Sequence, residues 1–454
     1  MSFRHINSFR CFSTSRIRYR PRLSADYKAQ ELWDARFNCP ILNDISRVKS
    51  INAKILTNDD LDNLELDVFI NIATPRTEEI VHLQETARIL KTFRRSRFAH
   101  TLLPSSHHAT CRLFLYSDKL PSLLTLLEDR INYGIFPDAY AMNLIFDEFL
   151  QRDQLSSAAR VAALMMFQDE FGLNSISDCF ALYSTLRYVE AKTDFVDWAT
   201  EDVSTDQIFS STSETDASNT ENKSTTDEST TGQNDDDDED DEDEDDAEYL
   251  RIPFLRNPYF DNHFDLKNPR LICGKTLNML VTSCLESTGN STELSSHCRL
   301  LGSILQGDWK AAQSVIDRLV QSKMSADNTT KELYHHLISN LHEITAPDEK
   351  ERSSLLSSLD NLTSNSGPTL SERVTGEFAN FGSQEGNDIK WLSNSLKFWS
   401  DTRHDVIRNI DLLESKKKLV QEIKAKKEEL RQREQYLFFY DRLKERRLTR
   451  MDYD

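Results

Sequence analysis

The chain has 454 residues, of which 38% are hydrophobic, and it contains only 11 Gly and 11 Pro. It shows neither a sustained strand pattern nor the Gly-rich turns of dinucleotide-binding and TIM-barrel enzymes, which argues against a sheet-based enzyme and favours helices. The formal net charge of −20 does not exclude a nucleic-acid partner, because 22 acidic residues and one Lys between Asp197 and Glu248 account for it and leave the rest near neutrality.

Residues 1–22 have the composition of a mitochondrial transit peptide. They contain six Arg, no Asp or Glu, and apolar side chains three residues apart at Phe3, Ile6, Phe9 and Phe12. On a helix this spacing places an apolar stripe beside an arginine face, whereas a secretory signal needs a continuous apolar segment. The alternative is a basic tail that binds nucleic acid. We expect import into the mitochondrial matrix.

Residues 23–198 show the periodicity of consecutive helices, with apolar residues at intervals of three and four. The two clearest stripes are Leu83, Ala87, Leu90 and Phe93, followed by Leu120, Leu123, Leu124 and Leu127. Segment 132–138 then contains Gly134, Pro137 and Asp138. A glycine at a helix C-cap, a proline that prevents continuation and an aspartate N-cap predict a compact helix–turn–helix junction.

The remaining chain is predicted to consist of four segments. Residues 199–250 form an acidic insert with an unbroken run from Asp235 to Asp246, and they have too few apolar side chains to offset the entropy of ordering. We expect this insert to be disordered. A second helical block is predicted over 251–345, a flexible Ser-, Asn- and Gly-rich linker over 346–389, and one long basic amphipathic helix over 390–454.

The junction at 132–138 resembles the end of a pentatricopeptide repeat, a helical unit of about 35 residues. Ala158 and Met165 stand at the positions of that family's small and large second-helix residues. Together with the phrases at 23–36 and 192–195, these features resemble the pentatricopeptide-repeat family numbered twenty-seven in the mitochondrial small ribosomal subunit. The resemblance implies an all-α helical-repeat solenoid without catalytic activity. It implies two kinds of partner, the small-subunit ribosomal RNA of the mitochondrion and neighbouring mitochondrial ribosomal proteins.

Two functions are compatible with this resemblance. One is a structural component of the small subunit of the mitochondrial ribosome, which supports translation. The alternative is a free pentatricopeptide factor that binds RNA in mitochondrial RNA processing or translation. Pentatricopeptide proteins that recognise RNA sequences contact base edges with a polar side chain of the first helix. Alignment of Leu144 and Ile145 with the family's apolar pair puts Met142 at this place, which favours the structural component.

The last predicted helix contains the candidate RNA-contacting residues. Nine positions from Leu412 to Tyr440 follow a four-three spacing, and six of them are apolar, which predicts a stripe that packs on a partner. The cations expected to contact phosphates are Lys416, Lys417, Lys418, Lys424, Lys426, Lys427, Arg431 and Arg433. Such contacts give salt-dependent affinity without sequence recognition. Equally compatible is a solvated helix with i,i+4 ion pairs, such as Glu422 with Lys426.

Motifs for catalysis or metal binding are incomplete. The phrase Gly-Lys-Thr at 274–276 ends like a phosphate loop, but Pro269 stands where the first Gly belongs. The His-Glu pair at 342–343 lacks a second His, because Ala346 occupies its place. We therefore expect a protein that is not an enzyme, with no catalytic, cofactor-binding or metal site. Without an apolar run near about 20 residues, we expect no membrane partner, and we also expect no DNA. The seven scattered Cys predict free thiols.

Overall fold

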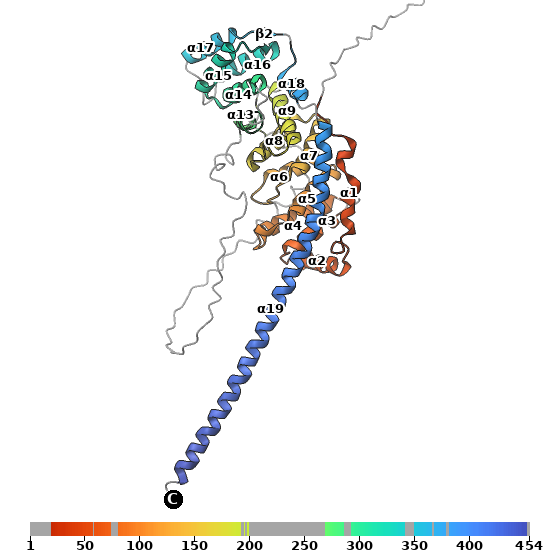
Figure 1. Ribbon diagram of the computed structural model, residues 1–454, viewed down its shortest axis with the longest axis vertical. Helices are drawn as coiled ribbons and strands as arrows, with labels where there is room; N and C mark the ends of the chain where they lie inside the picture. Colours follow the sequence, from red (N-terminus) through yellow and green to blue (C-terminus); the bar gives the residue numbers. More distant parts are fainter. Residues whose placement is uncertain are drawn as a thin grey trace, which may run out of the picture.

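The computed structural model describes residues 20–57, 59–73, 80–191, 195, 198, 268–285, 292–340, 349–365, 367–377 and 381–451. This part of the chain is almost entirely helical, which confirms the all-α prediction (Figure 1). The helices stack into an elongated body, and one long helix extends from it (Figure 1). The acidic insert at 199–250 lies outside the described residues, as does the expected transit peptide up to residue 19.

The body is built from short helices at the start of the chain and longer helices after them. Its first part comprises η1 (Ala25–Lys28), α1 (Gln30–Asp34), η2 (Ala35–Asn38), α2 (Ile45–Thr57), α3 (Asn63–Ile72), α4 (Ile80–Arg95), η3 (Ala99–Thr101), α5 (Pro104–Tyr116), α6 (Leu120–Glu128), α7 (Ala139–Gln151), α8 (Leu155–Gln168) and α9 (Ser175–Ala191). Its second part comprises α13 (Pro269–Leu280), the π-turn η4 (Val281–Leu285), α14 (Thr292–Gln306), α15 (Trp309–Gln321), β1 (Ala326–Asp327), α16 (Asn328–Asn340), α17 (Glu349–Asp360), β2 (Ser364–Asn365) and α18 (Leu370–Glu377). The long helix is α19 (Phe381–Met451), and β1 and β2 form a short parallel pair.

The predicted apolar stripes face the core. All eight stripe residues of α4 and α6 are at most 4% exposed. In α14, Leu300, Leu301, Ile304 and Leu305 are fully buried, as are Ala158 and Met165 of α8. Burying one such Leu side chain contributes roughly 1.5–3 kcal/mol, so packing of these stripes is the main interaction that holds the body together.

The turn between α6 and α7 differs in one respect from its prediction. Asp138 caps α7 as expected, because its carboxylate accepts a hydrogen bond from the Ala141 amide at 2.7 Å. Gly134 adopts a φ of +63°, but it is not the C-cap of α6, which already ends at Glu128. The helix stops earlier because the Asp129 carboxylate accepts a hydrogen bond, at 3.1 Å, from the amide three residues further on.

Residues 346–389, which were expected to form a flexible linker, contain helices. Both α17 and α18 lie in this range, and α19 begins at Phe381, before residue 390. Leu355 and Leu359 of α17 are at most 1% exposed, so this helix packs against the body. The prediction of a flexible linker is therefore wrong for the described part of this range. The high Ser and Asn content concealed a short apolar face, because two leucines four residues apart are a weak periodic signal.

The described cysteines are free thiols, as predicted. All six are buried: Cys39, Cys111, Cys179, Cys273, Cys284 and Cys298. Burial raises the pKa of the Cys273 and Cys284 thiols above their ordinary value, so these side chains behave as small apolar groups.

Candidate functional site

α19 is a 71-residue helix, about 105 Å long at 1.5 Å per residue. We call residues 381–410 its anchored half and residues 411–451 its free half. The anchored half lies along the body, and the free half extends beyond it (Figure 1). Every side chain from Asp411 to Leu448 is exposed. In the described part of the chain no helix, α19 included, is apolar over the length needed to cross a membrane.

Polar contacts fix the anchored half to the segment around Tyr27 and to the residue before α9. The Tyr27 hydroxyl donates a hydrogen bond to Asp388 at 2.7 Å, and the Asn174 side chain donates to the same carboxylate at 3.0 Å. Asn143 of α7 donates to the Tyr27 hydroxyl oxygen at 2.9 Å. Burial, together with the Asp388 carboxylate, raises the pKa of Tyr27 far above its ordinary value, so the hydroxyl stays a donor.

A buried ion pair is the last polar contact between the anchored half and the body, and Val406 and Ile407 pack against the core just after it. Arg403 Nε lies 2.6 Å from Asp67 Oδ2, and these side chains are 3% and 0% exposed. Asp67 of α3 also accepts hydrogen bonds from Asn71 at 3.0 Å, from Ser105, and from Ser106 at 2.8 Å. Its charge is thus compensated within the body. The start of the free half is therefore positioned by α3 and α5.

The place on α7 where a pentatricopeptide protein would contact an RNA base is buried within the body. Met142, which stands at the predicted base-contacting place, is 0% exposed. Tyr140 stacks on Tyr27 with ring centroids 4.6 Å apart and faces Trp391 of α19 at 6.4 Å. α19 contacts α5 and α9 as well. Met142 lies about 200° around α7 from Tyr140, so it faces the interior of the body and has no access to RNA.

The free half has three different faces, which follow from about 100° of rotation per residue. We call its narrow aliphatic face the apolar stripe, formed by Leu412, Leu419, Ile423, Leu430 and Leu437, which are 52–65% exposed. We call the four cations of the neighbouring face, Lys417, Lys424, Lys427 and Arg431, the cationic ridge; the exposed side chains of Leu413 and Val420 lie on the same face. The remaining face is mainly acidic, with Glu414, Glu422 and Glu429.

The structure places all eight predicted cations on the free half, but not on one face. Four of them form the cationic ridge, and Lys416 lies between the ridge and the apolar stripe. Lys426 and Arg433 lie on the other side of the stripe, and Lys418 lies among the acidic residues. The ridge is therefore the largest group of these cations that a single flat partner could contact.

Ion pairs neutralise little of this charge. Arg433 pairs with Glu429 at 2.7 Å, and both side chains are more than half exposed. Among the described residues, the other seven predicted cations have no carboxylate at ion-pair distance, and Lys426 does not pair with Glu422. Exposed pairs contribute little stability in any case. The geometry thus favours cations that are available to a partner over a helix laced with ion pairs.

The aromatic residues near the end of the free half do not form one patch. Tyr436, Phe438, Phe439 and Tyr440 are 60–70% exposed. Nearly consecutive positions on a helix project in different directions, and the rings of Phe439 and Tyr440 meet edge to face with centroids 6.1 Å apart. These four rings therefore do not form a docking patch on a single face of the helix.

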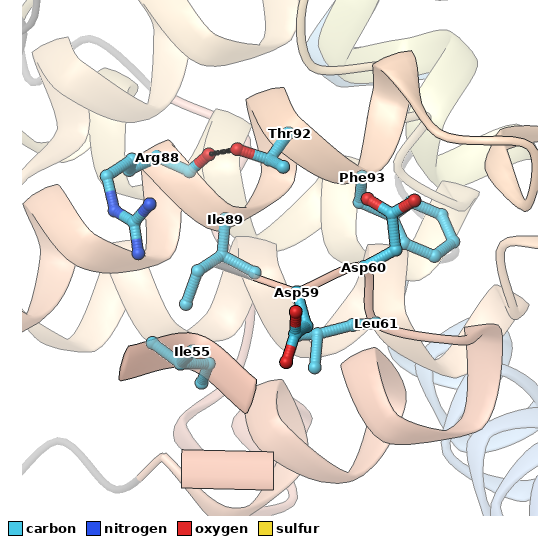
Figure 2. Close-up of a pocket in the computed structure, with 8 residues that line it drawn as sticks. All are labelled: Ile55, Asp59, Asp60, Leu61, Arg88, Ile89, Thr92 and Phe93. Atoms are coloured by element: carbon cyan, nitrogen blue, oxygen red, sulfur yellow. Dashed lines mark hydrogen bonds between the residues drawn. The ribbon is translucent and has the colours of Figure 1, made fainter. Parts of the chain in front are cut away.

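A pocket of about 240 Å³ opens between the end of α2 and α4 (Figure 2). Its lining consists of Ile55, Leu61, Ile89, Phe93, Asp59, Asp60, Arg88 and Thr92. The carboxylates of Asp59 and Asp60 point in different directions (Figure 2), and Arg88 pairs with Glu85 at 2.6 Å. This pocket therefore does not bring together two carboxylates for acid–base chemistry, and it contains none of the predicted site residues.

The Gly-Lys-Thr phrase at 274–276 has a packing role. It lies inside α13, where a Cβ at Gly274 would come within 3.0 Å of the Gly302 carbonyl oxygen of α14. The glycine lets the two helices approach closely, and no loop of amides exists here to bind a phosphate. The described residues contain no group of three potential metal ligands.

Comparison with known families agrees with the resemblance inferred from the sequence. Residues 1–429 match the family model described as mitochondrial 28S ribosomal protein S27. The match includes the whole body, the anchored half of α19 and the first part of the free half, which holds three of the four ridge residues. The chain therefore belongs to the mitochondrial 28S ribosomal protein S27 family, whose members are components of the small subunit of the mitochondrial ribosome in the mitochondrial matrix.

Proposed function

We propose that the protein is a non-catalytic scaffold that binds small-subunit ribosomal RNA through the cationic ridge of α19. The observation that carries this proposal is the ridge itself, four exposed cations on one side of a helix that extends beyond the body. Among the described residues these cations lack ion-pair partners. Cations of this kind contact phosphates and provide affinity without reading bases.

The apolar stripe supports a second contact, with a neighbouring ribosomal protein. Its five aliphatic side chains are 52–65% exposed, and an aligned apolar surface of this kind is stabilised when a partner covers it. Helices with such spacing bind apolar grooves or pack on another helix. We infer that the free half lies between RNA on its ridge and protein on its stripe.

The free pentatricopeptide factor has weaker support. A protein that recognises single-stranded RNA needs accessible first helices, yet Met142 is buried and Trp391 of the anchored half packs against Tyr140 on the other side of α7. The repeat character itself is supported by the cap at Asp138 and by the buried Ala158 and Met165. These features fit a helical-repeat scaffold, with RNA contacts placed elsewhere on the molecule.

Neutralising the cationic ridge tests the proposal. Replacing its four cations with Gln keeps a good helix former at each position. We expect affinity to fall for all RNA sequences alike. The slope of log affinity against log salt should flatten by about 0.7 to 0.9 for each phosphate that the helix no longer neutralises. Binding of the full-length chain to a synthetic ribosomal RNA hairpin, measured over a range of KCl concentrations, gives this slope.

A matched control separates the ridge from total charge. Lys390, Lys397, Arg408 and Lys418 are exposed cations of the same helix outside the ridge, and their joint replacement by Gln removes an equal charge. We expect the control to keep most of the salt slope. If both variants flatten the slope equally, RNA responds to the overall charge of α19, and the ridge is not a defined interface.

A further inference from the structure

Arg94, in the last turn of α4, is a buried cation with an unused hydrogen-bonding edge. Its side chain is 9% exposed, yet Nε and Nη2 have no hydrogen-bond partner among the described residues. These two nitrogens form an edge with which arginine binds phosphate or carboxylate in a bidentate manner. Burial lowers the pKa of Arg94, as expected for a cation that is removed from water without a nearby carboxylate.

The other buried arginines of the described structure differ from Arg94. Each donates at least one hydrogen bond: Arg36, Arg112, Arg130, Arg160, Arg270 and Arg403. Arg36, Arg160 and Arg403 also pair with carboxylates. Arg94 would break no hydrogen bond if its long side chain turned outwards. Its guanidinium is therefore available to an acceptor from outside the chain.

The turn between α6 and α7 provides the space for this guanidinium. A Cβ at Gly134 would lie 2.6 Å from Cζ of Arg94, so the guanidinium rests against the glycine backbone. A larger residue at this position would displace it. The glycine that marks the predicted junction thus has two local roles, a positive φ of +63° and close contact with Arg94.

The surrounding sequence favours a polyanion as the ligand. No Asp or Glu occurs from Thr86 to Ser117. Arg95 and Arg97 follow Arg94 and are exposed, so three guanidinium groups occur within four residues. A single carboxylate of a neighbouring protein would satisfy one of them, whereas an RNA backbone offers several phosphates in series.

We infer that Arg94, Arg95 and Arg97 form a phosphate-binding site for the RNA backbone on the body of the protein. Arg94 turns outwards and presents its Nε and Nη2 edge to one phosphate, and the two exposed arginines contact neighbouring phosphates. This site goes beyond the proposed function of α19, because it places RNA at the end of α4 and uses no residue of the free half.

The test compares Arg94→Met with the unmodified full-length chain, with a synthetic double-stranded RNA hairpin as the probe. We expect the melting temperature to be retained or to rise, because an uncompensated buried charge is removed. The slope of log affinity against log salt should flatten by about 0.7 to 0.9. Arg94→Lys should keep most of this slope, because the charge remains.

Arg130→Met is the matched control, because Arg130 is also buried but donates a hydrogen bond to the Leu164 carbonyl at 2.9 Å. We expect it to lower the melting temperature and to leave the salt slope unchanged. An unchanged slope in Arg94→Met would overturn the site, whatever its melting temperature. If a glutamate-rich peptide binds the unmodified chain as tightly as the hairpin does, and does not bind Arg94→Met, the ligand of this site is an acidic protein and not RNA. The comparison of Arg94→Met with the unmodified chain does not depend on the cationic ridge, so it remains valid if the ridge does not bind RNA.

Discussion

Replacing Ile145 with Asp is expected to prevent stable folding of the body. Ile145 is fully buried in α7, which packs against α5, α8 and α9. A carboxylate there would be stripped of its hydration without gaining a partner, at a cost of at least about 4 kcal/mol. That is a large part of the stability of about 5–15 kcal/mol that is typical of folded domains. Thermal unfolding followed by circular dichroism measures the effect.

Two variants isolate the cause of this destabilisation. Ile131→Asp makes the same substitution at a side chain that is 61% exposed, and we expect little change in melting temperature. Ile145→Val removes one methylene from the core and should cost about 1 kcal/mol. If Ile145→Asp melts like the unmodified chain, α7 does not pack with the face seen in the structure.

Replacing Arg403 with Met should destabilise the attachment of α19. The change leaves the fully buried Asp67 without its cation, and breaking a buried pair in this way costs about 3–5 kcal/mol. Hydrogen bonds from Asn71, Ser105 and Ser106 remain, so we expect a value near the lower end of that range. Urea unfolding measures the decrease in stability. Limited proteolysis should in addition cleave the anchored half faster than in the unmodified chain.

The matched control for this prediction is Arg408→Met. Arg408 pairs with Asp405 at 3.2 Å on the same helix, but both side chains are more than 60% exposed, so we expect little effect. The double variant Arg403→Met with Asp67→Asn removes both charges and should recover part of the stability. No recovery in the double variant would mean that Arg403 acts through packing, and that its charge is unimportant.

The helices and their buried faces were predictable from the sequence where the signal is local. Leu120, Leu123, Leu124 and Leu127 are spaced for one face of a helix, and that spacing alone places them in the core. Asp138 was recognised as an N-cap because a cap depends on a few adjacent residues. The family resemblance was likewise carried by short phrases that need no knowledge of the fold.

The contacts that organise the candidate sites depend on tertiary structure. Arg403 and Asp67 are separated by 336 positions. Arg94, at the end of α4, contacts Gly134 in the turn between α6 and α7. The sequence predicted cations along the last helix and a stripe of leucines. It determined the character of each helix, because hydrophobic periodicity and capping are properties of neighbouring residues. Which end of α19 is anchored, and which arginine stays unpaired, was decided only by packing, because burial and pairing depend on residues that are distant in the chain.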